Sequence, residues 1–140
     1  MVVPKWTMNG LEMMNHECFT SDVIGFVYRI TYTNGKEYIG SKLIRSLVRL
    51  KPTKEQLSIR KNFVRKEWKN KPYAKYIGSS KNTSGLAIAS REIIEVCSNK
   101  INLRYCETKW LFREDVLFGE KYLNENINGT YFKGRIEEGL

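Results

Sequence analysis

Two short runs rich in β-branched and aromatic residues, near 26–32 and 36–40, are separated by Thr33-Asn34-Gly35. An Asn-Gly pair between such runs is the strongest short-range signal for a β-hairpin. We therefore expect two antiparallel strands here, and the rest of the chain has to pack against them.

The length of the turn decides which side chains share a face of this hairpin, because alternate strand residues point to opposite sides. A two-residue Asn34-Gly35 loop would put Tyr28 and Tyr38 on opposite faces. A three-residue loop, with Gly35 in the left-handed conformation, would pair Ile30 with Tyr38 and bring both tyrosines to one face. The residues alone are compatible with both turn lengths.

The chain has 140 residues, which is enough for one domain with a core. No apolar run approaches the roughly 18 residues of a membrane span, and the first residues lack the features of a signal peptide. We expect a protein that stays in the cytoplasm of the cell that makes it and has no membrane partner.

Cysteine and histidine usage argues against several classes of site. Cys18, Cys97 and Cys106 are widely spaced and include no Cys-x-x-Cys pair, so buried free thiols are expected rather than a disulfide framework or a zinc site. His16 is the single histidine. A chain with one histidine cannot form a nuclease site built on paired histidines, and a serine-type triad, which needs a histidine near the core, is disfavoured. We expect His16 on the surface.

Positive charge is concentrated in one part of the chain. The net charge is +9, and twelve basic residues against two acidic ones lie between Lys42 and Lys75. Such a concentration is typical of a protein that binds a phosphate backbone, although a solvated lysine-rich face is the alternative. An anionic membrane is disfavoured, since the segment lacks an amphipathic apolar stripe. The candidate nucleic-acid contacts are Lys42, Arg45, Arg60, Lys61, Arg65, Lys66, Trp68 and Lys75.

Periodicity predicts the remaining elements. Leucine spacing over 42–48 predicts a short helix that ends before Pro52, and 53–66 reads as a basic loop or weak helix. Alternation over 90–96 predicts a third strand, and Asn102 is a candidate cap for a helix that runs to about Arg113.

These elements together predict an α/β (α+β) fold, with a small three-stranded antiparallel sheet flanked by helices. Residues 1–24 are expected to form an N-terminal extension, and 129–140 a C-terminal tail.

Glu107 occupies an unusual position in the predicted helix. Leu103, Trp110 and Leu111 flank it at helical spacing, so its carboxylate should face the sheet. Burial of an unpaired carboxylate costs several kcal/mol, and an Arg, a Lys or a metal ion should therefore meet it. A structural salt bridge and a metal site are equally compatible with these residues.

The hairpin resembles the GIY-YIG nuclease family, whose two tripeptides here read Phe26-Val27-Tyr28 and Tyr38-Ile39-Gly40. In that family both tyrosines face one active site, which implies the three-residue loop. The resemblance covers about 26–126 and is strongest to small stand-alone phage members, among which homing-type enzymes are common. Tyr76-Ile77-Gly78-Ser79-Ser80 also resembles the end of a Trp-x-x-Tyr-x-Gly-Ser-Ser string found in some of them. The nuclease domain would then span 25–128, with a basic insertion near 42–75, in the host cell's cytoplasm if a phage encodes it.

The resemblance implies a set of site residues. Glu107-Thr108-Lys109-Trp110-Leu111 matches the family's Glu-x-x-Trp-Ile/Leu helix, in which the glutamate holds a single divalent cation, here Mg²⁺ or Mn²⁺. Tyr122-Leu123-Asn124 resembles the family's aromatic-x-Asn string, so Asn124 is preferred to Asn126. The family's arginine is assigned to Arg49, with Arg45 in reserve.

The resemblance also implies roles for the tyrosines. Mechanisms proposed for the family make the first tyrosine a phenolate base, and Tyr28 would need nearby cations, such as Lys42 or Arg49, to lower its pKa from about 10. Tyr38 would orient the water or the phosphate.

Two functions follow from these expectations. The first is a metal-dependent endonuclease that hydrolyses phosphodiester bonds in DNA, or less readily RNA, and either nicks one strand or cuts both as a homodimer. The alternative is a catalytically silent basic nucleic-acid-binding module. Glu107 separates the two, because phosphate binding gains nothing from a buried acid on the binding face.

Overall fold

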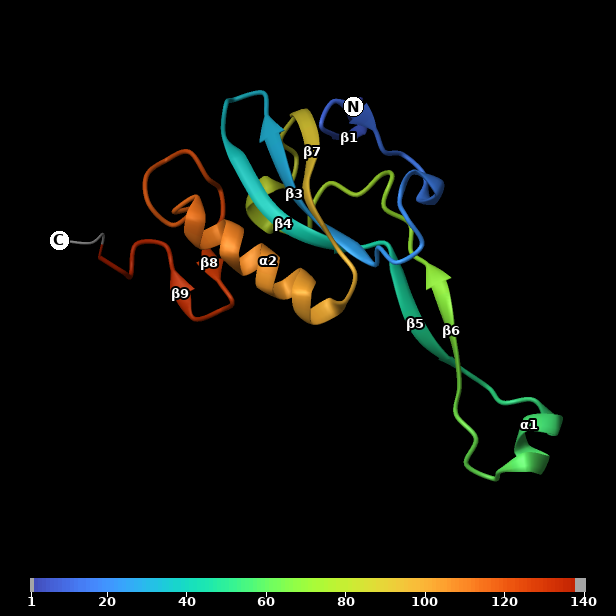
Figure 1. Ribbon diagram of the computed structural model, residues 1–140. Helices are drawn as coiled ribbons and strands as arrows, with labels where there is room; N and C mark the ends of the chain where they lie inside the picture. Colours follow the sequence, from blue (N-terminus) through green and yellow to red (C-terminus); the bar gives the residue numbers. More distant parts are fainter. Residues whose placement is uncertain (1, 138–140) are drawn as a thin grey trace.

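A five-stranded mixed sheet forms the centre of the computed structural model, which describes residues 2–137 (Figure 1). Its strand order is β2-β1-β7-β3-β4. The bounds are Trp6–Met8 for β1, Leu11–Glu12 for β2, Gly25–Tyr32 for β3, Glu37–Leu43 for β4 and Ile88–Cys97 for β7. The three expected antiparallel strands are β3, β4 and β7. The expectation of three strands is wrong because β1 pairs with β7 in parallel and β2 extends that edge.

The β3–β4 hairpin has the register of the three-residue loop. Tyr28 lies opposite Gly40 and Ile30 lies opposite Tyr38. Gly35 has a φ of +85°, a left-handed conformation that glycine adopts without a Cβ clash. The three-residue loop is therefore confirmed, and Tyr28 and Tyr38 share one face of the sheet.

A hydrophobic core lies on each face of the sheet. One core contains Phe26, Tyr28 and the N-terminal Trp6, whose side chain has no exposed surface. The other lies between the sheet and helix α2 (Lys100–Arg113), with Val27 among its members. The first 24 residues thus contribute both strands and core side chains to the fold.

β5 (Arg45–Leu50) and β6 (Arg65–Asn70) form a separate antiparallel ribbon that projects from the body, with helix α1 (Lys54–Ile59) at its tip (Figure 1). We call residues 45–70 the basic ribbon. The helix predicted over 42–48 is wrong, because these residues end β4 and begin β5. Pairing with β6 outweighs the local leucine spacing.

The root of the basic ribbon is fixed to the body by two side chains. His16 Nε2 lies 2.9 Å from the carbonyl oxygen of Ile44 and 3.0 Å from that of Lys71, and therefore donates to both. The Arg45 guanidinium donates to three carbonyl oxygens between residues 16 and 23. His16 is half-buried, so its expected surface placement is only partly correct.

The cap of α2 lies three residues before the predicted one. The Asn99 side chain accepts the N–H of Asn102 at 2.8 Å, so Asn99 caps the helix and the assignment of Asn102 is wrong. After α2, the short strands β8 (Asn126–Ile127) and β9 (Tyr131–Phe132) pair with each other.

The cysteines are free, as expected, but only two of them are buried. Cys97, at the end of β7, and Cys106, on α2, are buried in the core between the sheet and α2, whereas Cys18 is exposed, contrary to expectation. Two short 3-10 turns, His16–Cys18 and Lys81–Thr83, complete the elements of the described chain.

Residues 1 and 138–140, the outer ends of the expected extension and tail, lie outside the described chain. Over residues 2–137, no helix has the length and apolarity needed to cross a membrane.

Candidate active site

The candidate site lies along β4, the last strand of the sheet. A strand at the edge of a sheet leaves alternate backbone N–H groups without a strand partner. At Ile39 the side chain of Asn124 accepts this N–H at 3.1 Å. Ser41, two residues further along this edge, lines the same cavity as Glu107, and its backbone and hydroxyl groups lower the pKa of the Glu107 carboxyl group. The edge of β4 therefore positions Glu107 next to the Tyr38-Ile39-Gly40 tripeptide.

Glu107 lies on the face of α2 that meets the sheet, as the helical spacing predicted, and it is half-buried. Burial raises the pKa of its carboxyl group, while hydrogen bonds from Ser41 and the charge of Arg104 oppose the rise. None of the ion pairs formed between residues 2 and 137 includes Glu107. The protein itself thus compensates this carboxylate only in part.

Two adjoining cavities meet at Glu107. The larger, of about 480 Å³, is also lined by Tyr76 and by four cationic side chains. The smaller, of about 290 Å³, is lined by Tyr38, Ser80 and Asn124. Glu107 therefore faces open space on both sides.

The four cations of the larger cavity are Lys42, Lys71, Lys100 and Arg104. Burial and the charge of Lys71 lower the pKa of Lys42. These four positive charges line one cavity and repel one another. A phosphate bound there would relieve the repulsion, so the cavity favours an anionic ligand.

Three tyrosines cluster beside these cations. The ring centroid of Tyr28 lies 6.4 Å from that of Tyr38 and 5.8 Å from that of Tyr76. The Lys42 ammonium lies 4.9 Å from the centre of the Tyr76 ring. Tyr76 is a site residue that the sequence assignments omitted, although its string was the signal that could have identified it.

Burial governs the ionisation of the two hairpin tyrosines. Tyr28 is only 1% exposed, and its burial raises the pKa of its phenol, with Tyr76 adding to the effect. Burial and the charge of Glu107 raise the pKa of Tyr38 to about 12. Both hydroxyl groups are therefore protonated at neutral pH in the protein alone, and the cations expected to lower the pKa of Tyr28 do not do so.

Gly40 makes room for the Tyr28 ring. A Cβ atom at Gly40 would lie 2.5 Å from the Tyr28 hydroxyl oxygen and 2.7 Å from its Cζ atom. Only glycine leaves space for the ring across the strand.

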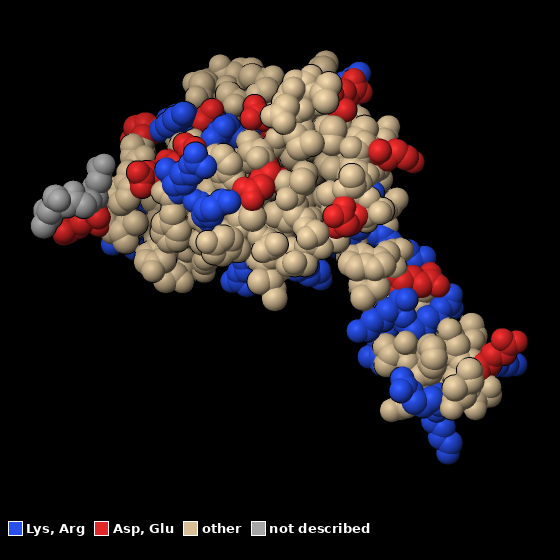
Figure 2. Space-filling model, in the orientation of Figure 1, with Lys and Arg blue, Asp and Glu red and all other residues tan. Residues whose placement is uncertain are grey.

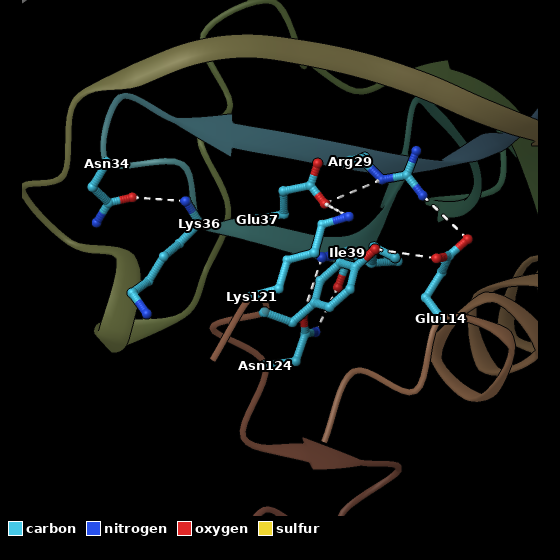
Figure 3. Close-up of polar contacts among 9 residues, drawn as sticks. Arg29, Asn34, Lys36, Glu37, Ile39, Glu114, Lys121 and Asn124 are labelled. Atoms are coloured by element: carbon cyan, nitrogen blue, oxygen red, sulfur yellow. Dashed lines mark hydrogen bonds and ion pairs between the residues drawn. The ribbon is translucent and has the colours of Figure 1, made fainter. Parts of the chain in front are cut away.

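Asn124 is buried and uses its whole amide group on the backbone of Ile39 (Figure 3). Nearby, Arg29 lies 3.4 Å from Glu114 and 3.9 Å from Glu37, and Lys121 lies 3.3 Å from Glu37. These contacts attach the segment after α2 to the sheet.

The two arginine candidates lie away from these cavities. Arg45 is engaged at the ribbon root, and Arg49 is exposed on the ribbon. Neither lines the cavities at Glu107, whereas Arg104, three residues before Glu107 on α2, lines the larger one. The i, i+3 spacing in the sequence could have indicated Arg104.

The eight expected nucleic-acid contacts lie in four places, and one of them, Arg45, is engaged at the ribbon root. Lys42 lines the larger cavity, while Trp68 and four of the basic residues lie in the ribbon beyond its root; these four are Arg60, Lys61, Arg65 and Lys66. Lys75 is exposed in the segment that follows the ribbon.

A second group of metal-ligating residue types lies on the far side of α2. One ligand atom from each of Glu95, Cys97 and Cys106 falls within 4.8 Å of the others. Glu95 accepts the Cys106 thiol at 2.9 Å and the Trp110 ring N–H at 2.8 Å. Burial raises the pKa of the Cys106 thiol to about 12. The Glu95 carboxylate, unlike that of Glu107, therefore has both hydrogen-bond donors and an ion-pair partner, Lys109, within the protein.

Together these features define a centre that can bind a phosphate beside the carboxylate of Glu107 and the phenols of Tyr38 and Tyr76, whereas Tyr28 lies behind them and lines neither cavity. The family model described as "Putative endonuclease segE, GIY-YIG domain" matches residues 6–127, a range that includes β1, the hairpin and α2. The chain therefore belongs to the GIY-YIG nuclease superfamily, and this membership implies a nuclease with a nucleic-acid substrate. No curated protein and no solved structure matches the chain.

Proposed function

We propose that this protein is an endonuclease that hydrolyses phosphodiester bonds in DNA with the help of one divalent cation, Mg²⁺ or Mn²⁺, held by Glu107. The observation that carries this proposal is the half-buried carboxylate of Glu107, which has no ion-pair partner in residues 2–137 and faces a cavity with four cations. A module that only bound phosphate would be weakened by a carboxylate at this position, because the two repel.

The donors at Glu107 suit a hard cation. Mg²⁺ is commonly held by one or two carboxylates, while waters and substrate phosphates complete its ligands. Within residues 2–137 the one triad of metal-ligating residue types, at Glu95, does not include Glu107. When bound, such a cation polarises a phosphoryl oxygen and stabilises the leaving alkoxide.

The cationic side chains bind the phosphates of the substrate in this proposal. Lys42, Lys71 and Lys100 bind the phosphates on either side of the cleaved bond. Arg104 takes the role that the resemblance gave to Arg49, because its planar donors match phosphate oxygens and it lines the same cavity as Glu107.

Tyr38 lines the smaller cavity and acts in our proposal as a hydrogen-bond donor to the attacking water or the phosphate, while Tyr28, which lines neither cavity, positions the rings of Tyr38 and Tyr76. Both are protonated in the protein alone, since burial raises their pKa values. A base role for Tyr28 requires added positive charge to offset its burial and the charge of Glu107. Tyr76, which contacts Tyr28, restricts where its hydroxyl can point.

A homing-type role and a homodimer stay predictions of the resemblance. One site built on Glu107 cuts one strand at a time, so a double-strand break requires two copies of the chain or two successive nicks.

Conversion of supercoiled plasmid tests the proposal. Wild type should produce nicked circles with Mg²⁺ and none with EDTA, whereas Glu107→Ala should be slower by about 100-fold or more and still bind DNA. Glu120→Ala removes the same charge from a side chain that is 97% exposed, and it should cut like wild type.

Two results would contradict the proposal. One is nicking by Glu107→Ala at the wild-type rate under matched salt. The other is a wild type that binds several unrelated DNA substrates and cuts none, which would favour the binding module.

A further inference from the structure

The two faces of the basic ribbon differ in how their charges are compensated. Cross-strand pairs join Leu47 with Trp68 and Arg49 with Lys66, so these four side chains share one face, here called the open face. Like charges directly opposite each other destabilise a ribbon, and no acidic residue of β5 or β6 lies on this face. The pairing of Arg49 with Lys66 therefore indicates a use other than stability.

The opposite face carries its own counter-charge. Glu67 lies 2.8 Å from Arg65 and 3.9 Å from Lys69. Figure 2 shows that Lys and Arg predominate over the ribbon, while the body carries both signs of charge on the side in view. The opposite face thus has one acid for its two cations, whereas the open face has cations and no acid.

The open face also exposes apolar surface between its cations. Trp68 is 61% exposed and Leu47 is 45% exposed. An exposed aromatic ring beside cationic side chains suits contact with the sugars and bases of a nucleic acid, because the ring stacks while the cations pair with phosphates.

The open face continues into the candidate active site. Leu47 and Trp68 line a cavity of about 340 Å³ together with Asn99 and Lys100 at the start of α2. Lys100 also lines the larger cavity at Glu107. A duplex bound along this side would therefore meet the open face and Glu107 in succession.

The dimensions of the ribbon fit one groove of DNA. Its six cross-strand pairs span about 20 Å at roughly 3.3 Å per residue. The major groove, about 12 Å wide, admits a two-stranded ribbon as it stands, whereas the minor groove, about 6 Å wide, has to be widened at a cost in DNA deformation energy. His16 and Arg45 hold the root in place before any ligand binds.

We propose that the open face of the basic ribbon enters the major groove of duplex DNA next to the bond that is cut, and so sets where the nuclease engages its substrate. This inference rests on the proposed DNA substrate. It assigns Arg49 to substrate binding rather than to chemistry.

Binding of a fluorescent 30-base-pair duplex in EDTA, followed by anisotropy, tests the two faces separately. Arg49→Ala/Lys66→Ala should weaken binding by about tenfold or more and reduce the slope of log K against log salt by about 2. Trp68→Ala should also weaken binding. The charge-matched control Lys54→Ala/Lys69→Ala removes two lysines of the same ribbon, one in α1 at its tip and one on the opposite face, and it should lose much less affinity for DNA.

Modified duplexes test the groove. Bulky substituents at C5 of thymine fill the major groove and should weaken binding of the wild type but not of Arg49→Ala/Lys66→Ala. Distamycin fills the minor groove of A·T tracts and should leave wild-type binding unchanged.

Three results would overturn the inference: equal losses in the two double variants, competition by distamycin, or a Trp68→Ala variant that converts a dimer to a monomer while each subunit keeps its DNA affinity. The plasmid assay keeps this inference separate from the proposed function. If the wild type nicks and Arg49→Ala/Lys66→Ala binds normally, the ribbon inference fails and the nuclease stands. If no substrate is cut and that variant loses binding, the nuclease fails and the ribbon inference stands.

Discussion

Asn124 holds the backbone of Ile39 with both ends of its amide group. Its Oδ1 accepts the Ile39 N–H at 3.1 Å, and its Nδ2 donates to the Ile39 carbonyl oxygen at 2.8 Å (Figure 3). Ile39 lies between Tyr38 and Gly40, so this contact fixes the part of β4 that carries the candidate site. Asn124 thus has a positioning role that the resemblance alone did not indicate.

Asn124→Leu should lower the free energy of unfolding by about 1–3 kcal/mol or more, because it leaves buried polar groups of Ile39 without partners. Urea denaturation measures the change, and plasmid cleavage should fall with it. Asn126→Ala is the matched control, since Asn126 is exposed, and it should cost less. Full stability of Asn124→Leu together with lost cleavage would argue against positioning and for direct contact with the substrate.

Gly40→Ala should displace the Tyr28 ring, because the added Cβ would lie 2.5 Å from the Tyr28 hydroxyl oxygen. Overpacking of this kind costs about 1–3 kcal/mol, and nicking should slow as the phenol moves. A double-mutant cycle with Tyr28→Ala checks the cause. If Gly40→Ala costs as much without the Tyr28 ring as with it, the clash is not the reason.

Glu107→Gln should stabilise the protein in EDTA at neutral pH while it abolishes cleavage. Burial raises the pKa of Glu107, so between the unfolded value near 4.5 and the folded value the native state binds more protons than the unfolded state. The contribution of Glu107 to stability is therefore fully present below that window and is lost as the pH rises through the folded pKa.

Unfolding free energies of wild type and Glu107→Gln from pH 4 to pH 8 isolate this contribution as a difference. A difference that stays constant over this range would contradict it. Added Mg²⁺ should raise the melting temperature of wild type only, since a ligand that binds the native state stabilises it.

Local signals in the sequence predicted the centre of the fold. The Asn34-Gly35 turn defined the hairpin because turn chemistry is set by adjacent residues. Elements whose partners lie far along the chain could not be predicted in this way. β1 depends on β7, some eighty residues later, and β5 depends on β6 across the tip of the ribbon.

The candidate site likewise combines one residue that a local signal predicted with others that depend on distant parts of the chain. Helical spacing alone placed Glu107 toward the sheet. The convergence of Lys71 and Lys100 on it depends on how the ribbon returns to the body and on where α2 begins. The choice of Arg49 failed to place a guanidinium beside Glu107 because it counted residues along a segment that leaves the body as a ribbon.

Titration with Mn²⁺, followed by the electron paramagnetic resonance signal of the free ion, tests most directly the claim that Glu107 holds the catalytic cation. Wild type and Glu95→Gln should bind the ion alike, because Glu95 is already compensated by Trp110 and Lys109. Glu107→Gln should weaken binding by at least about tenfold. Unchanged Mn²⁺ binding by Glu107→Gln, or its loss in Glu95→Gln, would contradict this account.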